Sequence, residues 1–208
     1  MRYRRFIASA LLSGFVAGGA NAAGIKLLPE LEQMYGQVEM EPPSSAHMTV
    51  CYGFACRLRL ALVFTAAERA SIIALMNKGR ASSVEVRKAI QQVFVWFDQR
   101  VARQVGTNKR VANADVRTFD ADHNFDCWDT TRNAASLLLV MQEWGALRHH
   151  RVSEPRYRGN ILKGQLPHNT AVLKETAAGG TSWVVDMWPT AFGHVPDVMT
   201  LEKWLNET

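Results

Sequence analysis

Apolar side chains recur every three or four residues in two parts of the chain, which is the spacing of one face of a helix. One such stripe predicts a helix with a buried face and consists of Val86, Ile90, Val93, Phe94, Phe97 and Val101. A second apolar run, at residues 134–144, predicts a helix that starts near Cys127 and ends at Gly145.

Capping signals place further helix starts. In Thr65-Ala66-Ala67-Glu68 and in Ser82-Ser83-Val84-Glu85, a hydroxyl and a carboxylate three residues apart satisfy the free N–H groups of a first helical turn. Residues 24–46 predict an extended segment with a helical turn near residues 28–35. A terminal helix is expected after Thr200, with inward side chains Leu201, Trp204 and Leu205.

Alternating and β-branched stretches predict strands. Residues 167–173 and 181–186 are joined by an Ala- and Gly-rich turn, which is the signature of a hairpin. Folding this hairpin about Ala177 or Ala178 sets His168 opposite Asp186 or its near neighbours, at about 5 Å if the side chains share a face.

Other segments are assigned by the same patterns. Residues 48–58 predict a hairpin with a four-residue turn, residues 108–124 a polar loop with a short strand at 116–119, and residues 153–160 a loop. The expected fold class is α+β, with the helix led by Cys127 packed on an antiparallel sheet and extra N-terminal helices covering it.

Residues 1–23 predict a secretory signal peptide. Arg2, Arg4 and Arg5 precede an apolar stretch, and Ala20-Asn21-Ala22-Ala23 supplies the small residues of a cleavage site. The stretch is shorter than the roughly 20 apolar residues of a membrane span. We therefore expect a periplasmic protein, with secretion as the alternative, whose single domain covers residues 24–208 and has no membrane span after leader cleavage.

The net charge indicates which binding partners are expected. The net charge of +5 includes the three leader arginines, so the mature protein is only mildly basic and no nucleic-acid partner is expected. Cysteine usage says more. Three cysteines in an oxidising compartment leave one unpaired, and Cys51 and Cys56 are close enough to form a disulfide across the first hairpin. Cys127 then remains as the free thiol.

Cys127 has the sequence setting of a nucleophile. The free N–H groups and the positive end of the dipole in a first helical turn stabilise a thiolate, which attacks carbonyl carbon. His168 is the expected general base and Asp186 the residue that orients it.

The order Cys, His, Asp resembles the papain-like superfamily, and specifically its transglutaminase-like branch. Asp126-Cys127-Trp128-Asp129 is similar to the Asp-Cys-x-Asp segment of the bacterial transglutaminase-like cysteine proteinases, and the resemblance covers roughly residues 124–188. It implies a papain-like, transglutaminase-type core. No cofactor is expected, although the resemblance implies that Asp126 and Asp129 contact calcium or substrate in some relatives. The alternative is that both acids only complement the helix dipole.

Other residues remain candidates. The backbone N–H of Cys127 is expected to bind the oxyanion, with Asn124 or Gln165 as a second donor, and Trp128 and Trp188 either wall the cleft or belong to the core. His194 is the rival base. A metal site built on histidines, the remaining ones being His149 and His150, is not expected because no pair has a recognised ligand spacing.

These residues predict an exported cysteine hydrolase that cleaves amide bonds of a protein or a cell-wall peptide through a thioacyl intermediate. Two alternatives stay open. One is a peptidoglycan amidase or endopeptidase with a similar triad order. The other is a non-catalytic periplasmic binding or assembly module on the same fold, for which an unreactive thiol would be the sign.

Overall fold

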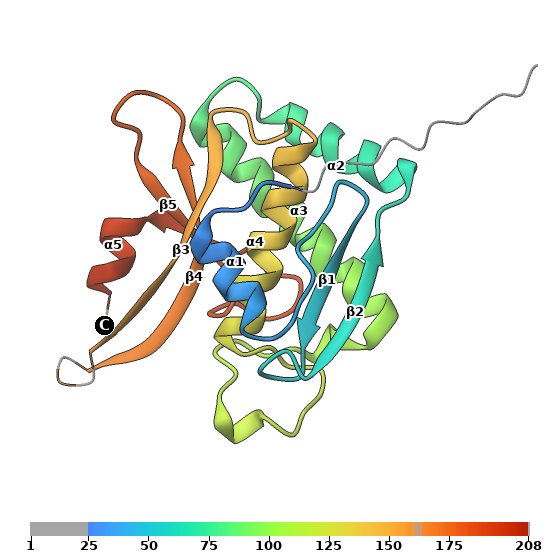
Figure 1. The fold of residues 1–208 in the computed structure, drawn as a ribbon, viewed down its shortest axis with the longest axis vertical. Helices are drawn as coiled ribbons and strands as arrows, with labels where there is room; N and C mark the ends of the chain where they lie inside the picture. Colours follow the sequence, from blue (N-terminus) through green and yellow to red (C-terminus); the bar gives the residue numbers. More distant parts are fainter. Residues whose placement is uncertain (1–24, 161, 163, 208) are drawn as a thin grey trace, which may run out of the picture.

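The computed structural model describes residues 25–160, 162 and 164–207. It is a mixed α/β protein in which one helix, α4 (Cys127–Glu143), lies between two antiparallel sheets (Figure 1). The predicted signal peptide lies outside the described residues. No helix in the described part of the chain combines the length and the apolar character needed to cross a membrane.

Four further helices begin or lie close to where the sequence predicts them: α1 (Pro29–Gly36), α2 (Ala66–Lys78), α3 (Ser83–Val105) and α5 (Leu201–Asn206). The capping box before α2 forms as expected, and the hydroxyl of Ser82 accepts the N–H of Glu85 at the start of α3. The apolar stripe of α3 is buried along its whole length, as its spacing predicts.

Two predictions are wrong, one about a short strand and one about a side chain of the terminal helix. Residues 116–119 do not form a strand, because Val116–Thr118 is a 3₁₀ turn whose N-cap is Asp115. On α5, Trp204 is buried as expected, but Leu205 is 36% exposed and faces outward. A helix of six residues turns only part of its circumference toward the core.

The smaller sheet is the predicted disulfide hairpin of β1 (His47–Tyr52) and β2 (Leu58–Val63). The disulfide joins Cys51 to Cys56, as predicted. Its place in the hairpin differs, however, because Cys51 pairs with Arg59 and Cys56 belongs to the loop. The disulfide therefore ties the loop back to β1.

The larger sheet has the order β3-β4-β5-β6 and consists of β3 (His150–Asn160), β4 (Gln165–Glu175), β5 (Ser182–Asp186) and β6 (Asp197–Thr200). The β4–β5 hairpin is the predicted one. The loop expected at residues 153–160 is instead part of the edge strand β3, where Pro155 falls at an irregularity of the ladder. Proline fits there because it has no N–H to donate to a ladder.

Polar side chains fix α4 to both sheets. The side chain of Asn133 binds the backbone N and O of Cys51 in β1, at 2.7 and 2.8 Å. The hydroxyl of Thr131 lies 2.9 Å from the carbonyl oxygen of Asn169 in β4 and accepts the Asn169 amide at 3.1 Å. These buried bonds hold the start of α4 at one end of the larger sheet.

Candidate active site

His168 and Asp186 form the closest polar pair of the predicted site. Ala171 of β4 pairs with Val185 of β5, so Asp186 ends β5 just beyond the last paired residue. Nε2 of His168 lies 2.5 Å from Oδ2 of Asp186, and both side chains are 3% exposed. The hairpin register thus joins the predicted base to its predicted partner.

Two tryptophans pack around this pair. The Trp188 ring centroid lies 4.6 Å from that of His168, and the Trp204 ring of α5 lies 5.5 Å from it. Asp186 also accepts the indole N–H of Trp204 at 3.0 Å and the backbone N–H of Trp188 at 3.2 Å. The carboxylate is therefore held by three donors in surroundings with little water.

The bond to Asp186 decides which ring nitrogen of His168 is free to accept a proton. A carboxylate accepts hydrogen bonds, so Nε2 carries the hydrogen and Nδ1 is the bare nitrogen in the neutral ring. Nδ1 is buried and has no hydrogen-bond partner among the described residues. A buried acceptor without a donor is costly, and such atoms are typical of functional sites.

Cys127 is the first residue of α4 and is a free thiol, as predicted. The backbone N–H of Asn169, which follows His168 in β4, acts on the thiol and lowers its pKa. No hydrogen bond joins the sulfur to Nδ1 of His168 within the described residues. The structure thus joins two of the three predicted residues directly and sets the third beside the same stretch of β4.

The side chains of His168 and Asn169 point to opposite faces of β4, which explains why only one of them contacts α4. Asn169 contacts Thr131 on α4, whereas His168 contacts Trp204 on α5. Successive strand residues point to opposite faces, so α4 and the ring of His168 lie on different faces of the sheet.

The pKa of Cys127 is raised, whereas its position at a helix start predicts a lowered pKa. Burial raises the pKa of this thiol to about 11, and the charges of Asp126 and Asp186 add to the rise, while the N–H of Asn169 lowers it. The helix terminus is thus outweighed by desolvation and by two nearby carboxylates. The resting thiol is protonated at neutral pH.

Asp126 and Asp129 hold the disulfide loop against the start of α4. Asp126 accepts the N–H groups of Asp129 and Ala55, each at 2.7 Å, and Asp129 accepts those of Phe54 at 2.9 Å and Cys56 at 2.7 Å. All four carboxylate oxygens are used in this way. The two acids thus act mainly on the protein itself, and the arrangement does not favour the calcium contact that the resemblance implies.

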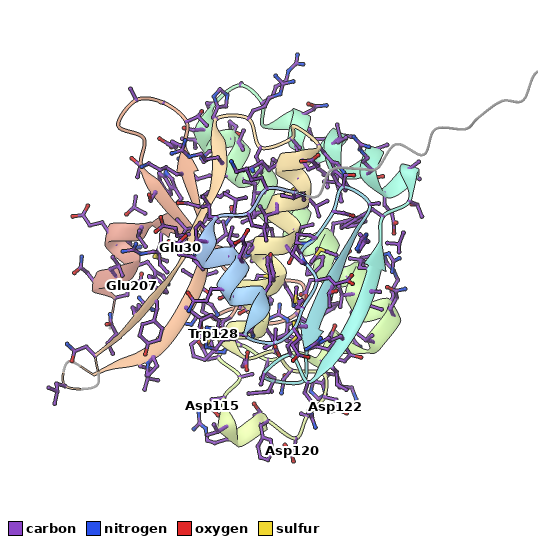
Figure 2. All side chains as sticks on the ribbon, viewed as in Figure 1. Glu30, Asp115, Asp120, Asp122, Trp128 and Glu207 are labelled. Atoms are coloured by element: carbon purple, nitrogen blue, oxygen red, sulfur yellow. A yellow bond between two sulfur atoms is a disulfide. The ribbon has the colours of Figure 1, made fainter. Side chains whose placement is uncertain are left out.

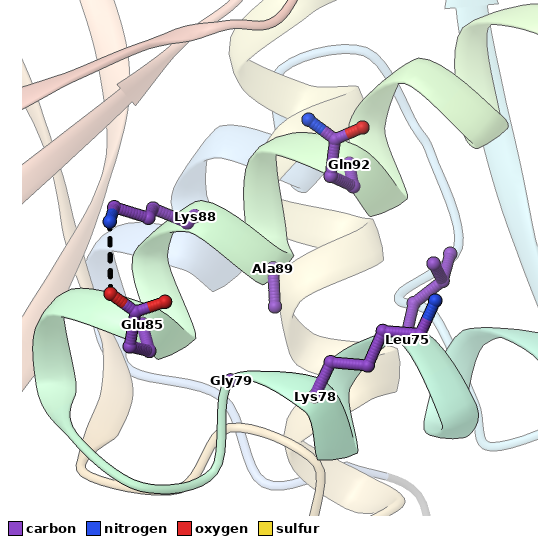
Figure 3. Close-up of a pocket in the computed structure, with 7 residues that line it drawn as sticks. All are labelled: Leu75, Lys78, Gly79, Glu85, Lys88, Ala89 and Gln92. Atoms are coloured by element: carbon purple, nitrogen blue, oxygen red, sulfur yellow. Dashed lines mark hydrogen bonds and ion pairs between the residues drawn. The ribbon is translucent and has the colours of Figure 1, made fainter.

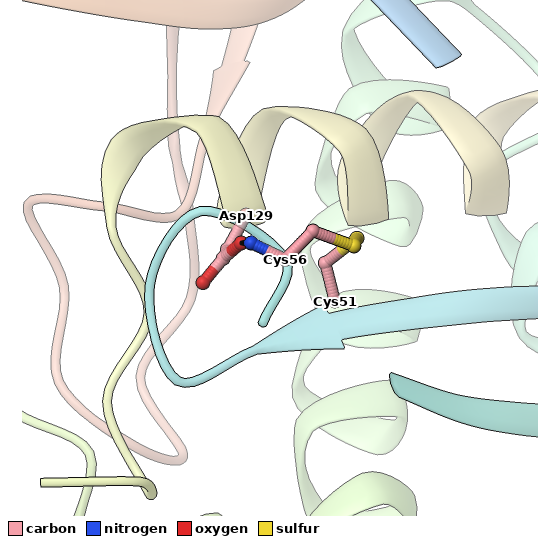
Figure 4. Close-up of side chains that lie close together, drawn as sticks. All are labelled: Cys51, Cys56 and Asp129. Atoms are coloured by element: carbon pink, nitrogen blue, oxygen red, sulfur yellow. Dashed lines mark hydrogen bonds between the residues drawn. A yellow bond between two sulfur atoms is a disulfide. The ribbon is translucent and has the colours of Figure 1, made fainter. Parts of the chain in front are cut away.

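The loop held by these acids has an unusual backbone. Gly53, Phe54, Ala55 and Cys56 have φ angles of 73°, 67°, 50° and 56°. Non-glycine residues rarely adopt this left-handed region, so the loop needs support from elsewhere. The disulfide and the two carboxylates supply that support, and Figure 4 shows Asp129 beside the bridge from Cys51 to Cys56.

Asp129 is the most perturbed acid of this group. Burial and the neighbouring charge of Asp126 raise its pKa to about 7, while the N–H of Cys56 opposes the rise. Sγ of Cys51 and Cys56 lie near its carboxylate, which gives a group of three metal-ligand types. Both sulfurs belong to the disulfide, so they are not available as thiolate ligands.

The two side chains expected to bind the oxyanion, those of Gln165 and Asn124, differ in whether their amide N–H groups are already used. Gln165 donates to the carbonyl oxygens of Leu205 and Glu207, at 3.0 and 2.8 Å, so its amide serves to hold the chain after α5. Asn124 lies closer in sequence to Cys127, and its side-chain oxygen accepts the N–H of Val111 at 3.1 Å. Its amide N–H group has no acceptor among the described residues and remains the better candidate.

The two tryptophans expected near the cleft, Trp188 and Trp128, lie in different surroundings. Trp188 packs on His168, as expected of a cleft wall, and its indole donates to Ala114 at 2.9 Å. Trp128 is partly exposed, and the guanidinium carbon of Arg132 lies 5.2 Å from the centroid of the Trp128 ring. Figure 2 shows Trp128 at the end of α4 where the loop carrying Asp115, Asp120 and Asp122 projects.

The other candidate histidines make no hydrogen bond to Asp186 among the described residues. His150 is buried between Arg87, 3.1 Å from its Nε2, and the carbonyl of Arg148. His149 contacts the carbonyl of Arg80 at 3.1 Å. His194, the rival base, is not among the residues that bind Asp186.

The loop that carries Trp188 is anchored by a buried ion pair that the sequence did not reveal. Arg110 lies 2.9 Å from the carboxylate of Asp98 on α3, and both side chains are at most 2% exposed. Arg110 also donates to the carbonyl of Thr190 at 2.5 Å, and Asp98 accepts the N–H of Gly193 at 2.7 Å. Their positions in a polar loop and on a helix gave no signal of this contact.

One hollow adjoins the predicted site, and a larger one does not. A small one of about 70 Å³ adjoins His168 and Asp186 and is also lined by Trp188 and Trp204. A larger one of about 290 Å³ lies between α2 and α3, where Lys88 pairs with Glu85 at 2.9 Å (Figure 3). The larger hollow contains none of the predicted site residues, so we assign no chemistry to it.

Comparison of the chain with protein-family models, with curated proteins and with solved structures finds no match. The site therefore has to be interpreted from its own geometry.

Proposed function

We propose that the protein is a cysteine hydrolase that acts on amide bonds of a protein or a cell-wall peptide. The observation that carries the proposal is the bond between His168 and Asp186, which leaves a buried, unpartnered Nδ1 as the available base. The free thiol of Cys127, beside Asn169 at the start of α4, supports it. A papain-like, transglutaminase-type core is the fold that this proposal implies.

The raised pKa of Cys127 determines how the reaction would begin. Because the thiol is protonated at rest, attack requires that Nδ1 of His168 take the thiol proton as the sulfur bonds to the carbonyl carbon. The imidazolium then gives this proton to the leaving amine, and a thioester remains on Cys127. Water hydrolyses the thioester and regenerates the thiol. Asp186 keeps the proton on Nε2 throughout.

The oxyanion of the tetrahedral intermediate needs donors at the start of α4. The backbone N–H of Cys127 belongs to the first helical turn and has no partner within the helix. We assign it as one donor and the side-chain N–H of Asn124 as the second. Calcium has no role in this mechanism, since Asp126 and Asp129 already bind backbone N–H groups.

The reaction is tested with p-nitrophenyl acetate, which acylates a nucleophilic thiol without requiring knowledge of the natural substrate. Intact-mass analysis should find one acetyl group on Cys127, which water then removes. His168→Ala should slow acetylation by about 100-fold or more, the range for loss of a general base. His194→Ala is the control and should react as the wild type does.

The outcomes separate the alternatives. Equal acetylation of the wild type and His168→Ala would overturn the assignment of His168, and loss in His194→Ala would identify the rival base. A wild-type Cys127 that is never acetylated would favour a non-catalytic binding or assembly module. Cleavage of peptidoglycan peptides but not of unfolded protein would identify the amidase or endopeptidase.

We also propose that the protein is exported to the periplasm. The leader expected at residues 1–23 has indirect support, because a disulfide between Cys51 and Cys56 suits an oxidising compartment. Intact-mass measurement of the periplasmic fraction should give a chain that begins at Ala23 or Gly24. A full-length chain in that fraction would contradict cleavage of the leader.

A further inference from the structure

Trp204 joins the C-terminal helix to the proposed base. Its indole nitrogen lies 3.0 Å from Oδ2 of Asp186, the oxygen that also faces Nε2 of His168 at 2.5 Å. Trp204 is 1% exposed, so this bond lies where water does not compete for its partners. The sequence predicts for Trp204 only that it is an inward side chain of the terminal helix.

We propose that Trp204 is a positioning residue of the catalytic group, which holds Oδ2 of Asp186 on Nε2 of His168 through its indole N–H. The catalytic consequence of this inference rests on the proposed function. The bond itself is a property of the fold and can be tested separately.

The position of Asp186 explains why it needs such support. Asp186 is the last residue of β5, and the backbone N–H of Trp188 at 3.2 Å is the only donor to its Oδ1 among the described residues. With the indole N–H on Oδ2, rotation of the carboxylate about its side-chain bond would break bonds at both oxygens. Without it, His168 alone would hold Oδ2, and the tautomer of the base would be less firmly set.

Trp204 is itself held by contacts that do not involve its indole N–H. The guanidinium of Arg158 lies 4.4 Å from the Trp204 ring and donates to the Trp204 carbonyl. The ring also packs with Val172 and Val184. These contacts fix the direction of the indole N–H, and they do not depend on it.

A matched pair of substitutions separates the N–H from the ring. Trp204→Phe keeps an aromatic ring between Val172 and Val184 and removes the donor. Trp183→Phe is the control, because the Trp183 indole also donates to a carboxylate, Oε1 of Glu175 at 3.1 Å, but away from His168. Both variants lose one indole–carboxylate bond from the same sheet.

The measurement is solvent exchange of the His168 Nε2 proton by NMR in histidine-labelled protein, assigned by its absence in His168→Gln. We expect exchange at least about tenfold faster in Trp204→Phe and unchanged in Trp183→Phe, since a bond to a charged group is lost. Acetylation of Cys127 should slow about tenfold in the same variant. If Trp204→Phe does not fold, a benzothienyl-alanine at position 204 removes the N–H with the ring shape kept.

The results distinguish this inference from the proposed function. Unchanged exchange in Trp204→Phe, or in the benzothienyl variant, would overturn the positioning role whatever Cys127 does. Faster exchange together with an inert wild-type Cys127 would leave the role of Trp204 on the His168–Asp186 pair intact and reject the hydrolase. Equal effects in Trp204→Phe and Trp183→Phe would show general loosening of the sheet and would also overturn the inference.

Discussion

Oδ1 of Asp129, in the first turn of α4, lies 2.7 Å from the backbone N–H of Cys56 in the disulfide loop. Asp126 reaches the same loop through Ala55. The residues on both sides of Cys127 therefore hold a left-handed loop of the smaller sheet, while Thr131 binds the larger one. Cys127 is thus placed by contacts with two sheets that are far apart in sequence.

Removal of Asp129 should destabilise the fold more than removal of Asp126. Asp129→Ala leaves two backbone N–H groups of the loop without acceptors, so the free energy of unfolding should fall by about 3 kcal/mol. Asp126→Ala removes a helix cap and one loop contact and should cost about 1–2 kcal/mol. Urea unfolding measures both. Asp122→Ala, an exposed partner of Arg57, should leave the midpoint unchanged, and an equal loss in all three variants would contradict this role.

The hydroxyl of Thr131 should matter for reactivity, whereas that of Thr130 should not. Thr131→Val removes the bond between α4 and Asn169, so acetylation of Cys127 should slow several-fold, with a loss of about 1 kcal/mol in stability. The Thr130 hydroxyl lies 3.0 Å from the Cys127 carbonyl and makes no hydrogen bond to β4 among the described residues. Thr131→Ser should restore the rate. Equal rates in Thr131→Val and Thr130→Val would argue against a link to the strand.

Arg110 should be needed to hold the Trp188 loop. Arg110→Met leaves the carboxylate of Asp98 buried without its cation, which should lower the free energy of unfolding by about 3–5 kcal/mol. The double variant Arg110→Met, Asp98→Leu should recover part of this loss, because no unpaired charge remains. Denaturant unfolding of the wild type, both single variants and the double variant gives the coupling energy. Strict additivity of the two single losses would disprove the pairing.

The fold should lose stability in acid through His150. Burial lowers the pKa of this ring below its usual value, and the charge of Arg87 adds to the fall. The unfolded chain therefore takes up the proton first as the pH falls below about 6.5, and the folded state loses stability from there downward. His150→Gln should remove this part of the pH dependence of unfolding. His149→Gln, at an exposed histidine, should keep it, and an unchanged profile in His150→Gln would refute the assignment.

Local sequence patterns were sufficient for the helices, for the disulfide and for the contact between His168 and Asp186. The capping box before α2, the apolar stripe of α3 and the Cys51–Cys56 pairing depend on residues close in the chain, and the structure contains them. The partnership of His168 and Asp186 was predictable because one short turn sets the register of their hairpin. The edge strand β3 was missed because Pro155 and Gly159 are typical of loops, and only pairing with β4 makes that segment a strand.

What the sequence by itself determined was therefore what lies within one helix or one hairpin: the position of Cys127 at a helix start, and the pairing of its expected base. The tertiary structure alone decided the environment of these groups. Burial, and the carboxylate of Asp186 from β5 in addition to that of the neighbouring Asp126, raise the pKa of Cys127, and the ring of His168 lies on the α5 face of the sheet, where Trp204 binds its partner. Desolvation and charge act through space, so residues far apart in the chain set them, and a local pattern carries no record of which residues these are.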